Sequence, residues 1–271
     1  MTNQDEGRTD FYSIQYARFG SALAAEIRRE VFGEDIGQQG WRTAAEQAEI
    51  ADFLRVGQVN LVLDVACGSG GPSLAFVERT GCRLTGVDRE EVGIGYAQAQ
   101  VLARGLSGRA TFSVLDCEKP LPFEEGGFDA VMCIDAISHL RDRYETLRDW
   151  ARLLRNGGRL VFTDVAVITG AITKSELDIR VASGPFVFVP PGINEDAIKA
   201  AGLTLLRLED RTTAIVEIGT RMCSARARHA ATLKQEEGAD GFEKRQRLYA
   251  TAAELAKSSR LSRFLYVAER S

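Results

Sequence analysis

The chain has 271 residues, of which 45% are hydrophobic, and its 34 basic and 38 acidic residues give a formal net charge of −4. Its length lies between one large domain and two small ones, and either could bury a sizeable core. Nucleic-acid-binding proteins carry a basic surface, so this balance predicts no nucleic-acid partner. No apolar run approaches the roughly 18 residues of a membrane span.

The five cysteines, at positions 67, 82, 117, 133 and 223, are an odd number, and no two have the spacing of metal ligands. We interpret them as buried reduced thiols, which predicts a soluble cytoplasmic protein without a metal site. Residues 1–10 are polar and acidic, and they lack the apolar centre of a secretory signal.

Residues 1–57 predict a helical arm ahead of the first strand. Aromatic residues recur at helical spacing, and a second helical pattern follows with Thr43 as its N-cap; these features are Phe11, Tyr12, Tyr16, Phe19 and residues 43–54. The loop between the two patterns, residues 33–41, contains three glycines. We hypothesise that Gln38, Gln39 and Trp41 line the entrance to a substrate pocket. A surface loop with Trp41 in the core is the alternative.

From residue 58 onward, strands and helices alternate. This alternation predicts an α/β fold of Rossmann-like type, with a mostly parallel sheet and helices on both faces. Right-handed crossovers then bring the carboxyl ends of the strands, and the ligand crevice, to one edge. Strands are expected at 61–66, 83–88, 111–115, 128–134 and 159–165, with helices at 73–80, 92–104 and 144–154.

The last third of the chain departs from this alternation. A short helix is expected at 194–201, a sixth strand at 203–208 and a final strand at 263–268. Two insertions, at about 166–194 and 213–258, do not separate as a second domain, and the second predicts two helices broken near residues 238–241. We interpret both insertions as a lid over the crevice of a single domain, residues 58–271.

The first strand is followed by the motif Asp64-Val65-Ala66-Cys67-Gly68-Ser69-Gly70-Gly71-Pro72. Gly68 and Gly70 allow a tight turn and the close approach of a ligand, and Pro72 suits the first turn of a helix. A strand, a glycine loop and a helix in this order bring backbone N–H groups to a ligand. An ordinary strand-to-helix turn is the alternative.

Three acids accompany this motif. Asp88 ends the second strand, where its carboxylate can accept the hydroxyls of a ribose or cap the next helix. Asp116 ends the third strand, where it can accept a hydrogen bond from an exocyclic amine or be a solvated strand end. Asp64 lies inside the first strand, and a buried acid needs partners, which loop N–H groups or a ligand ammonium would supply.

The segment Leu63-Asp64-Val65-Ala66-Cys67-Gly68-Ser69-Gly70, together with Asp88 and Asp116, resembles the class I S-adenosylmethionine-dependent methyltransferases. It is most similar to their small-molecule group, which includes ubiquinone/menaquinone-pathway and sarcosine/dimethylglycine methyltransferases. The resemblance covers roughly residues 58–165. Ala66 stands where many members have glycine.

The resemblance implies a seven-stranded sheet with an antiparallel last strand, which suits residues 263–268, and S-adenosylmethionine as the cofactor. In this family the glycine loop surrounds the methionine part, the second-strand acid holds the ribose and the third-strand acid faces adenine. Carried over by position, the cofactor-binding residues are Asp64, Ala66, Cys67, Gly68, Gly70, Asp88, Arg89, Leu115, Asp116, Cys117 and Ile134.

The end of the fourth strand faces the reacting methyl group in this fold. His139 is a candidate general base, since an unperturbed imidazole has a pKa near 6.5; a helix-capping or packing role is the alternative. Asp164, at the end of the fifth strand, could orient the ring or bind substrate, and Ser138 is expected to contact the substrate. Many acceptors are already nucleophilic, so positioning can supply much of the rate.

The predicted function is methyl transfer to an O, N or C nucleophile of a small-molecule metabolite. A cofactor-binding protein without transfer activity, and a cyclase on the same fold, are alternatives. An NAD(P)-dependent oxidoreductase is less favoured, because its fingerprint requires glycine or alanine where Ser73 follows Gly70. The sequence leaves a monomer or a homodimer open.

Overall fold

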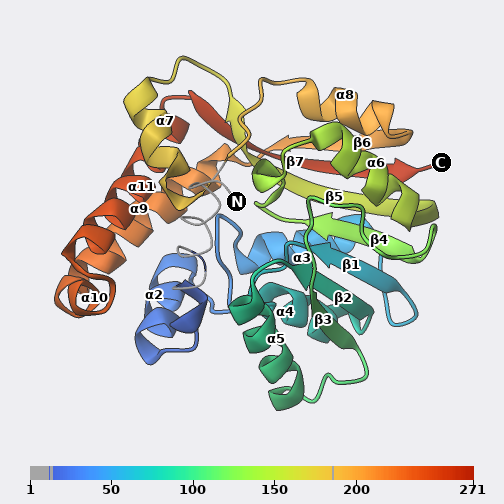
Figure 1. Ribbon diagram of the computed structural model, residues 1–271, viewed down its shortest axis with the longest axis horizontal. Coiled ribbons are helices and arrows are strands. Elements are labelled where there is room, and N and C mark those ends of the chain that lie inside the picture. Colours follow the sequence, from blue (N-terminus) through green and yellow to red (C-terminus); the bar gives the residue numbers. More distant parts are fainter. Residues whose placement is uncertain (1–11, 13–14, 185) are drawn as a thin grey trace.

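The computed structural model describes Tyr12, residues 15–184 and residues 186–271. Its centre is a seven-stranded sheet with the order β3-β2-β1-β4-β5-β7-β6 (Figure 1). The strands are β1 (Leu61–Val65), β2 (Arg83–Asp88), β3 (Ala110–Val114), β4 (Phe128–Cys133), β5 (Leu154–Ile168), β6 (Leu203–Asp210) and β7 (Leu261–Arg270).

The strand pairing confirms the predicted fold class. β1 pairs in parallel with β2 on one side and β4 on the other, and β7 runs antiparallel to both β5 and β6. The chain therefore changes direction across the sheet between β1 and β4. In open α/β sheets, ligands bind beyond the carboxyl ends of the strands at such a switch point.

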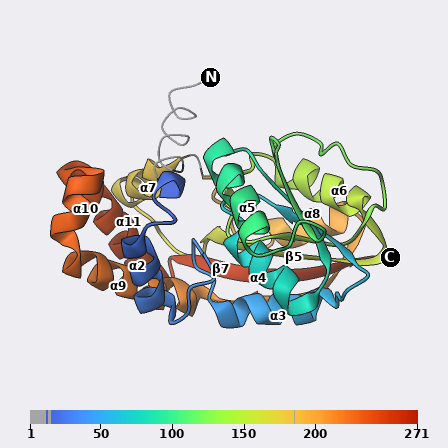
Figure 2. The same ribbon diagram turned by 90° about the horizontal axis from the view of Figure 1, so that it is seen from below.

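Helices cover both faces of the sheet (Figures 1 and 2), which explains why the central strands β1 and β4 are buried almost throughout. One face packs against α3 (Ala44–Leu54), α4 (Gly71–Thr80) and α5 (Glu91–Ala103). The other packs against α6 (Arg143–Leu153) and α8 (Ile193–Ala200). None of the helices in the described part of the chain is long and apolar enough to cross a membrane.

A further group of helices lies beyond the carboxyl ends of the parallel strands, on the left in Figure 1. It has its own hydrophobic cluster, which includes Phe32, Ile215 and Phe242. The sequence predicts two helices in the second insertion, but the structure has three, because the chain also breaks at His229. The group contains α2 (Ala22–Phe32), α7 (Lys174–Arg180), α9 (Thr212–Arg228), α10 (Ala230–Glu237) and α11 (Ala239–Lys257).

Most element boundaries agree with the sequence to within a few residues. The N-cap is as expected, since Thr43 Oγ1 accepts a hydrogen bond from the Glu46 N–H. β5 is longer than expected because it pairs with β4 from Leu154 and with β7 as far as Ile168. Of the N-terminal aromatic residues, Phe11 lies outside the described residues.

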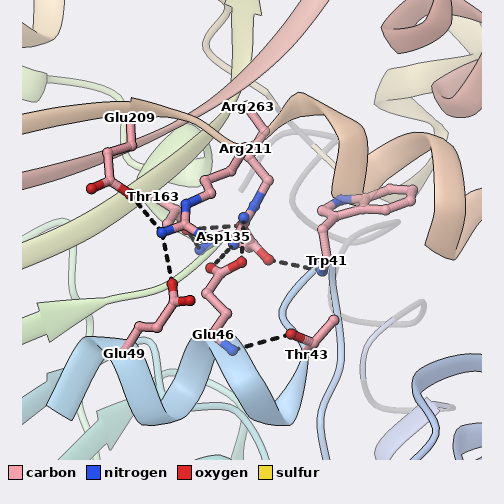
Figure 3. A network of polar contacts seen from close by, with 9 residues as sticks. All are labelled: Trp41, Thr43, Glu46, Glu49, Asp135, Thr163, Glu209, Arg211 and Arg263. Atoms are coloured by element: carbon pink, nitrogen blue, oxygen red, sulfur yellow. Dashed lines mark hydrogen bonds and ion pairs between the residues drawn. The ribbon is translucent and has the colours of Figure 1, made fainter. Parts of the chain in front are cut away.

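A buried ion-pair network joins the N-terminal arm to the sheet (Figure 3). The Arg263 side chain on β7 is fully buried, and its Nη atoms donate to the Glu46 carboxylate at 2.6 and 2.9 Å. Its Nε donates to Asp135 Oδ1 at 2.7 Å, and Asp135 Oδ2 accepts the Trp41 N–H at 2.8 Å. Burial alone would lower the pKa of Arg263, but Asp135 and Glu46 raise it above its ordinary value.

Replacement of Arg263 should destabilise the fold strongly. Arg263→Met leaves Glu46 and Asp135 buried without their cation, so we expect the free energy of unfolding to fall by about 3–5 kcal/mol. Arg211→Met is the matched control, because Arg211 is partly exposed between Glu49 and Glu209 (Figure 3), and it should cost about 1 kcal/mol or less. Urea denaturation at pH 7 compares the two, and equal losses would contradict the assigned role.

Candidate active site

A cavity opens at the carboxyl ends of the first four strands. Its sheet side consists of residues at or just after the ends of β1, β2, β3 and β4, namely 66–69, 88–90, 116–118 and 134–136. Its other walls come from the arm, from both insertions and from the segment after β4 that contains His139. These walls include Tyr12, Tyr16, Gln39, Trp41, Arg42, His139, Arg180, Phe186, Leu248 and Tyr249.

The glycine loop shapes the cavity wall, with Ala66, Gly68 and Gly70 all at positive φ. Three of its N–H groups donate hydrogen bonds within the protein. The Cys67 N–H donates to the Val87 carbonyl at 3.0 Å, and the Gly70 N–H donates to the Cys67 carbonyl at 3.1 Å. The Gly68 N–H donates to Asp88 Oδ2 at 2.8 Å. This corrects the expectation that these amides face a ligand.

The two central glycines serve different purposes. A Cβ on Gly68 would lie 2.7 Å from the Tyr16 hydroxyl, so Gly68 lets the arm approach the cavity wall. A Cβ on Gly70 would lie 2.6 Å from Ala97 Cβ and 3.0 Å from the Phe112 ring. Gly70 therefore allows α4 to pack against α5 and β3, and it lies outside the cavity lining.

The acids at the strand ends lie where the sequence predicts. Asp88 lines the cavity and ties the glycine loop to β2 through the Gly68 N–H, while its Oδ1 accepts the Glu90 N–H at 2.9 Å. Asp116 lines the cavity as well. Its partial burial would raise its pKa, but the Glu118 N–H and Lys119 lower it below the ordinary value. Of the flanking positions, Arg89, Cys117 and Ile134 line the cavity, whereas Leu115 packs against the core.

Asp64 is buried outside the cavity lining. Its Oδ2 accepts a hydrogen bond from Ser73 Oγ at 2.6 Å. Burial is the largest cause that raises the pKa of Asp64 to about 6, although Arg42 and Ser73 oppose the shift. The expected ligand contact is thus replaced by a contact that joins β1 to α4.

The loop of the arm, residues 33–41, places two of its three predicted residues in the cavity lining. Gln39 and Trp41 line the cavity, and the Trp41 ring packs edge-on against Tyr249 at 6.1 Å. Gln38 is turned into its own loop, where its amide bonds the Ile36 N–H and the Glu34 carbonyl. The expectation that Gln38 lines the pocket is therefore corrected, because these bonds hold its side chain inside the loop.

Two buried groups in this wall lack hydrogen-bond partners among the described residues. They are Gln39 Nε2 and the Nε and Nη1 atoms of Arg42. Burial lowers the pKa of Arg42, and the nearby carboxylates Asp64, Asp135 and Glu46 partly oppose that shift. Buried donors without partners are costly, so this wall is suited to an anionic ligand group.

His139 lies at the end of the short helix η1 (Ile137–His139) and lines the cavity. Its Nε2 atom is 3.0 Å from the Tyr12 hydroxyl, and its ring centre is 4.4 Å from that of Phe186. Ser138 is fully buried outside the lining, and its carbonyl accepts the Val187 N–H at 2.7 Å. Ser138 therefore packs inside the protein, and the expectation that it contacts the substrate is corrected.

Asp164 is also placed differently from the prediction. Its carboxylate is fully buried and accepts hydrogen bonds from Arg143 at 2.8 Å, Asn194 at 2.9 Å and the Ala166 N–H at 2.9 Å. Arg143 also donates to the Ile137 carbonyl at 2.8 Å. Asp164 thus supports η1 through Arg143, and it lies outside the cavity lining.

Several lining residues were not predicted as site residues: Tyr12, Tyr16, Arg42, Asp135, Arg180, Phe186 and Tyr249. The helical spacing of Tyr12 and Tyr16 is a signal that could have found these two. For metal binding, the described residues hold one exposed group with ligand atoms within 4.8 Å, namely Glu26, Glu30 and His229. Glu30 is already paired with Arg228 there.

Comparison with known proteins supports a specific family. Residues 62–158 match the family described as Methyltransferase domain. Methyltransferase GfsG of Streptomyces halstedii is 33% identical over 155 residues, which cover 53% of this chain and 55% of that protein. The match therefore spans about half the length of this relative.

Two solved structures share the fold over nearly the whole chain. A protein from Galdieria sulphuraria described as a sarcosine dimethylglycine methyltransferase has a TM-score of 0.81 at 17% identity, covering 97% of this chain and 98% of that one. The [4+2]-cyclase SpnF has a TM-score of 0.74 at 20% identity, covering 99% and 96%. At these identities the likeness concerns the fold alone.

The sheet order and the match of residues 62–158 support the resemblance to the class I S-adenosylmethionine-dependent methyltransferases that the sequence predicts.

Asp64 should make the stability of the protein depend on pH. Its ordinary pKa is 3.8 and its folded pKa is about 6. Between these values the folded state retains a proton that the unfolded state releases. The free energy of unfolding should therefore fall by up to about 3 kcal/mol as the pH rises from about 4 to above 6.

Asp64→Asn should remove this dependence, and Asp52→Asn, at an exposed carboxylate, should retain it. Urea denaturation at pH 4, 5, 6 and 7 measures the difference between each variant and the wild type. A difference for Asp64→Asn that stays constant across the series would contradict the assignment.

Proposed function

We propose that this protein transfers the methyl group of S-adenosylmethionine to an O, N or C nucleophile of a small-molecule metabolite. The observation that carries the proposal is a single cavity lined by two chemically different sets of residues. We assign the first set, the glycine loop and the strand-end acids, to a cofactor end, and the second set, the pair formed by Tyr12 and His139, to an acceptor end.

The first end fits the adenosyl amino acid. Asp88, held by the Gly68 and Glu90 N–H groups, would accept the ribose hydroxyls, and Asp116 would face adenine. The unpartnered donors of Gln39 and Arg42 match a carboxylate, since charged hydrogen bonds would satisfy both. When bound, the cofactor supplies an electrophilic methyl group on a sulfonium.

The second end fits an acceptor that must be oriented and deprotonated. His139 Nε2 would accept the proton of an attacking hydroxyl or amine, and the Tyr12 hydroxyl beside it would hold the ring in place. The aromatic rings of Phe186, Trp41 and Tyr249 would exclude water and position the acceptor.

We propose that residues 1–57 form a helical arm that covers the site, and that residues 58–271 form the methyltransferase domain, whose insertions at about 166–194 and 213–258 form the substrate lid. Arg180 and Phe186 from the first insertion, and Leu248 and Tyr249 from the second, line the cavity and support this division. A cytoplasmic location belongs to the same proposal, as does the absence of a nucleic-acid partner, which the mild net charge of −4 supports.

The ribose assignment of Asp88 can be tested with S-adenosylhomocysteine. Asp88→Asn should weaken its binding by about 10- to 100-fold, because a charged acceptor in a buried site is lost. Asp116→Asn, at a partly exposed carboxylate, should cost less than about tenfold. Isothermal titration calorimetry measures both. Near-normal affinity of the Asp88 variant, or preference for a nicotinamide dinucleotide, would refute the assignment.

The role of His139 can be tested after screening hydroxyl, amine and carbon acceptors with methyl-labelled cofactor. On the best acceptor, His139→Ala should lower kcat by about 100-fold and leave the affinity for S-adenosylhomocysteine unchanged. Tyr12→Phe should have a smaller effect of the same kind. An unchanged kcat for His139→Ala would remove it as the base, and conversion of an acceptor without label transfer would favour a cyclase.

A further inference from the structure

Arg180 is exceptional among the buried arginines that the structure describes. Arg28, Arg143, Arg226 and Arg263 each donate to a carboxylate, and Arg42 lies near three acids. Arg180, at the end of α7, has no carboxylate partner in the described part of the chain, and its Nε has no hydrogen bond. Its side chain is nevertheless only 2% exposed.

The surroundings of Arg180 are aromatic. Its guanidinium carbon lies 5.3 Å from the ring centre of Phe186. Burial is the largest cause that lowers the pKa of Arg180 to about 10, which Tyr12 partly opposes, so the side chain remains charged at neutral pH. A ring face compensates such a charge only in part, and an unpaired buried charge is costly to the fold.

The location of this charge connects it to the reaction site. Arg180 lines the cavity together with Phe186, whose ring contacts His139, which in turn contacts Tyr12. The five acids of the cavity lining lie at or just after the ends of β2, β3 and β4, and they are Asp88, Glu90, Asp116, Glu118 and Asp135. Among the described residues, the guanidinium near the candidate base therefore has no carboxylate partner of its own.

We propose that the methyl acceptor carries an anionic oxyacid group, a carboxylate or a phosphate, which Arg180 binds. The planar guanidinium fork binds both groups through paired hydrogen bonds. With the anion fixed at Arg180, the rest of the acceptor extends past Phe186, so its nucleophile lies at His139. This inference rests on the proposed methyl transfer, and it names the class of substrate.

The test uses the full-length protein saturated with S-adenosylhomocysteine and three probes of similar size: phenylacetate, phenyl phosphate and neutral phenylacetamide. At constant ionic strength, at least one anion should raise Tm by about 2 °C or more, whereas phenylacetamide should not. The anion that protects distinguishes the carboxylate from the phosphate. Absence of protection by both anions, or equal protection by phenylacetamide, would overturn the proposal.

Arg180→Met is the informative variant, and Arg148→Met, at an exposed arginine of α6, controls for the lost charge. Arg180→Met should lose the anion effect and keep its affinity for S-adenosylhomocysteine. Without probes its Tm should rise by about 2–4 °C, because a costly buried charge is removed. A fall in Tm, or retained anion protection, would show that Arg180 is structural.

The two proposals fail in distinguishable ways. If the wild type does not bind S-adenosylhomocysteine, the proposed methyl transfer fails. The same three probes applied without S-adenosylhomocysteine then still test the anion site. If S-adenosylhomocysteine binds normally but the anions do not depend on Arg180, only the substrate class is refuted.

Discussion

The buried guanidinium of Arg263 is the interaction on which the architecture around the cavity depends. It joins the last strand to Glu46 in α3 and to Asp135 after β4 (Figure 3). Asp135 then holds the Trp41 N–H, so one cation positions the arm against the sheet. Because all three charges are out of water, they stabilise the fold only as a complete set. The arm can form a cavity wall because this set holds it.

Charge pairing in the cavity differs from charge pairing in the rest of the fold. In the fold, buried arginines such as Arg143 are paired with a carboxylate, here Asp164. In the cavity, neither Arg42 nor Arg180 donates to a carboxylate of the described residues, and both retain buried donor atoms without partners. Such groups lower stability, and proteins retain them where a ligand completes the pairing. The two arginines lie near different residues, Arg42 near Asp64 and Arg180 near Phe186, which supports a separate anionic group for each.

The local sequence patterns were sufficient for most of the fold and for the sheet side of the site. Apolar runs, glycine breaks and the Thr43 cap depend on nearby residues, so their elements appear where expected. The positions of Asp88 and Asp116 in the cavity lining follow from their places at the ends of strands. Asp164 stands at an equivalent place, yet it is paired with Arg143, which lies 21 residues away in the sequence. Its role could not be predicted because the partner is not local.

The sequence by itself therefore determined the class of fold, the glycine loop and the two acids beside it, since periodicity and strand order place these features. Only the tertiary structure decided which polar groups face the cavity and which are used in the protein. It turned Gln38 into its loop and left Arg180 without an acidic partner in the part of the chain that the structure describes. The physical reason is that hydrogen bonds and ion pairs depend on distances in the folded structure, which the pattern of residues along the sequence does not specify.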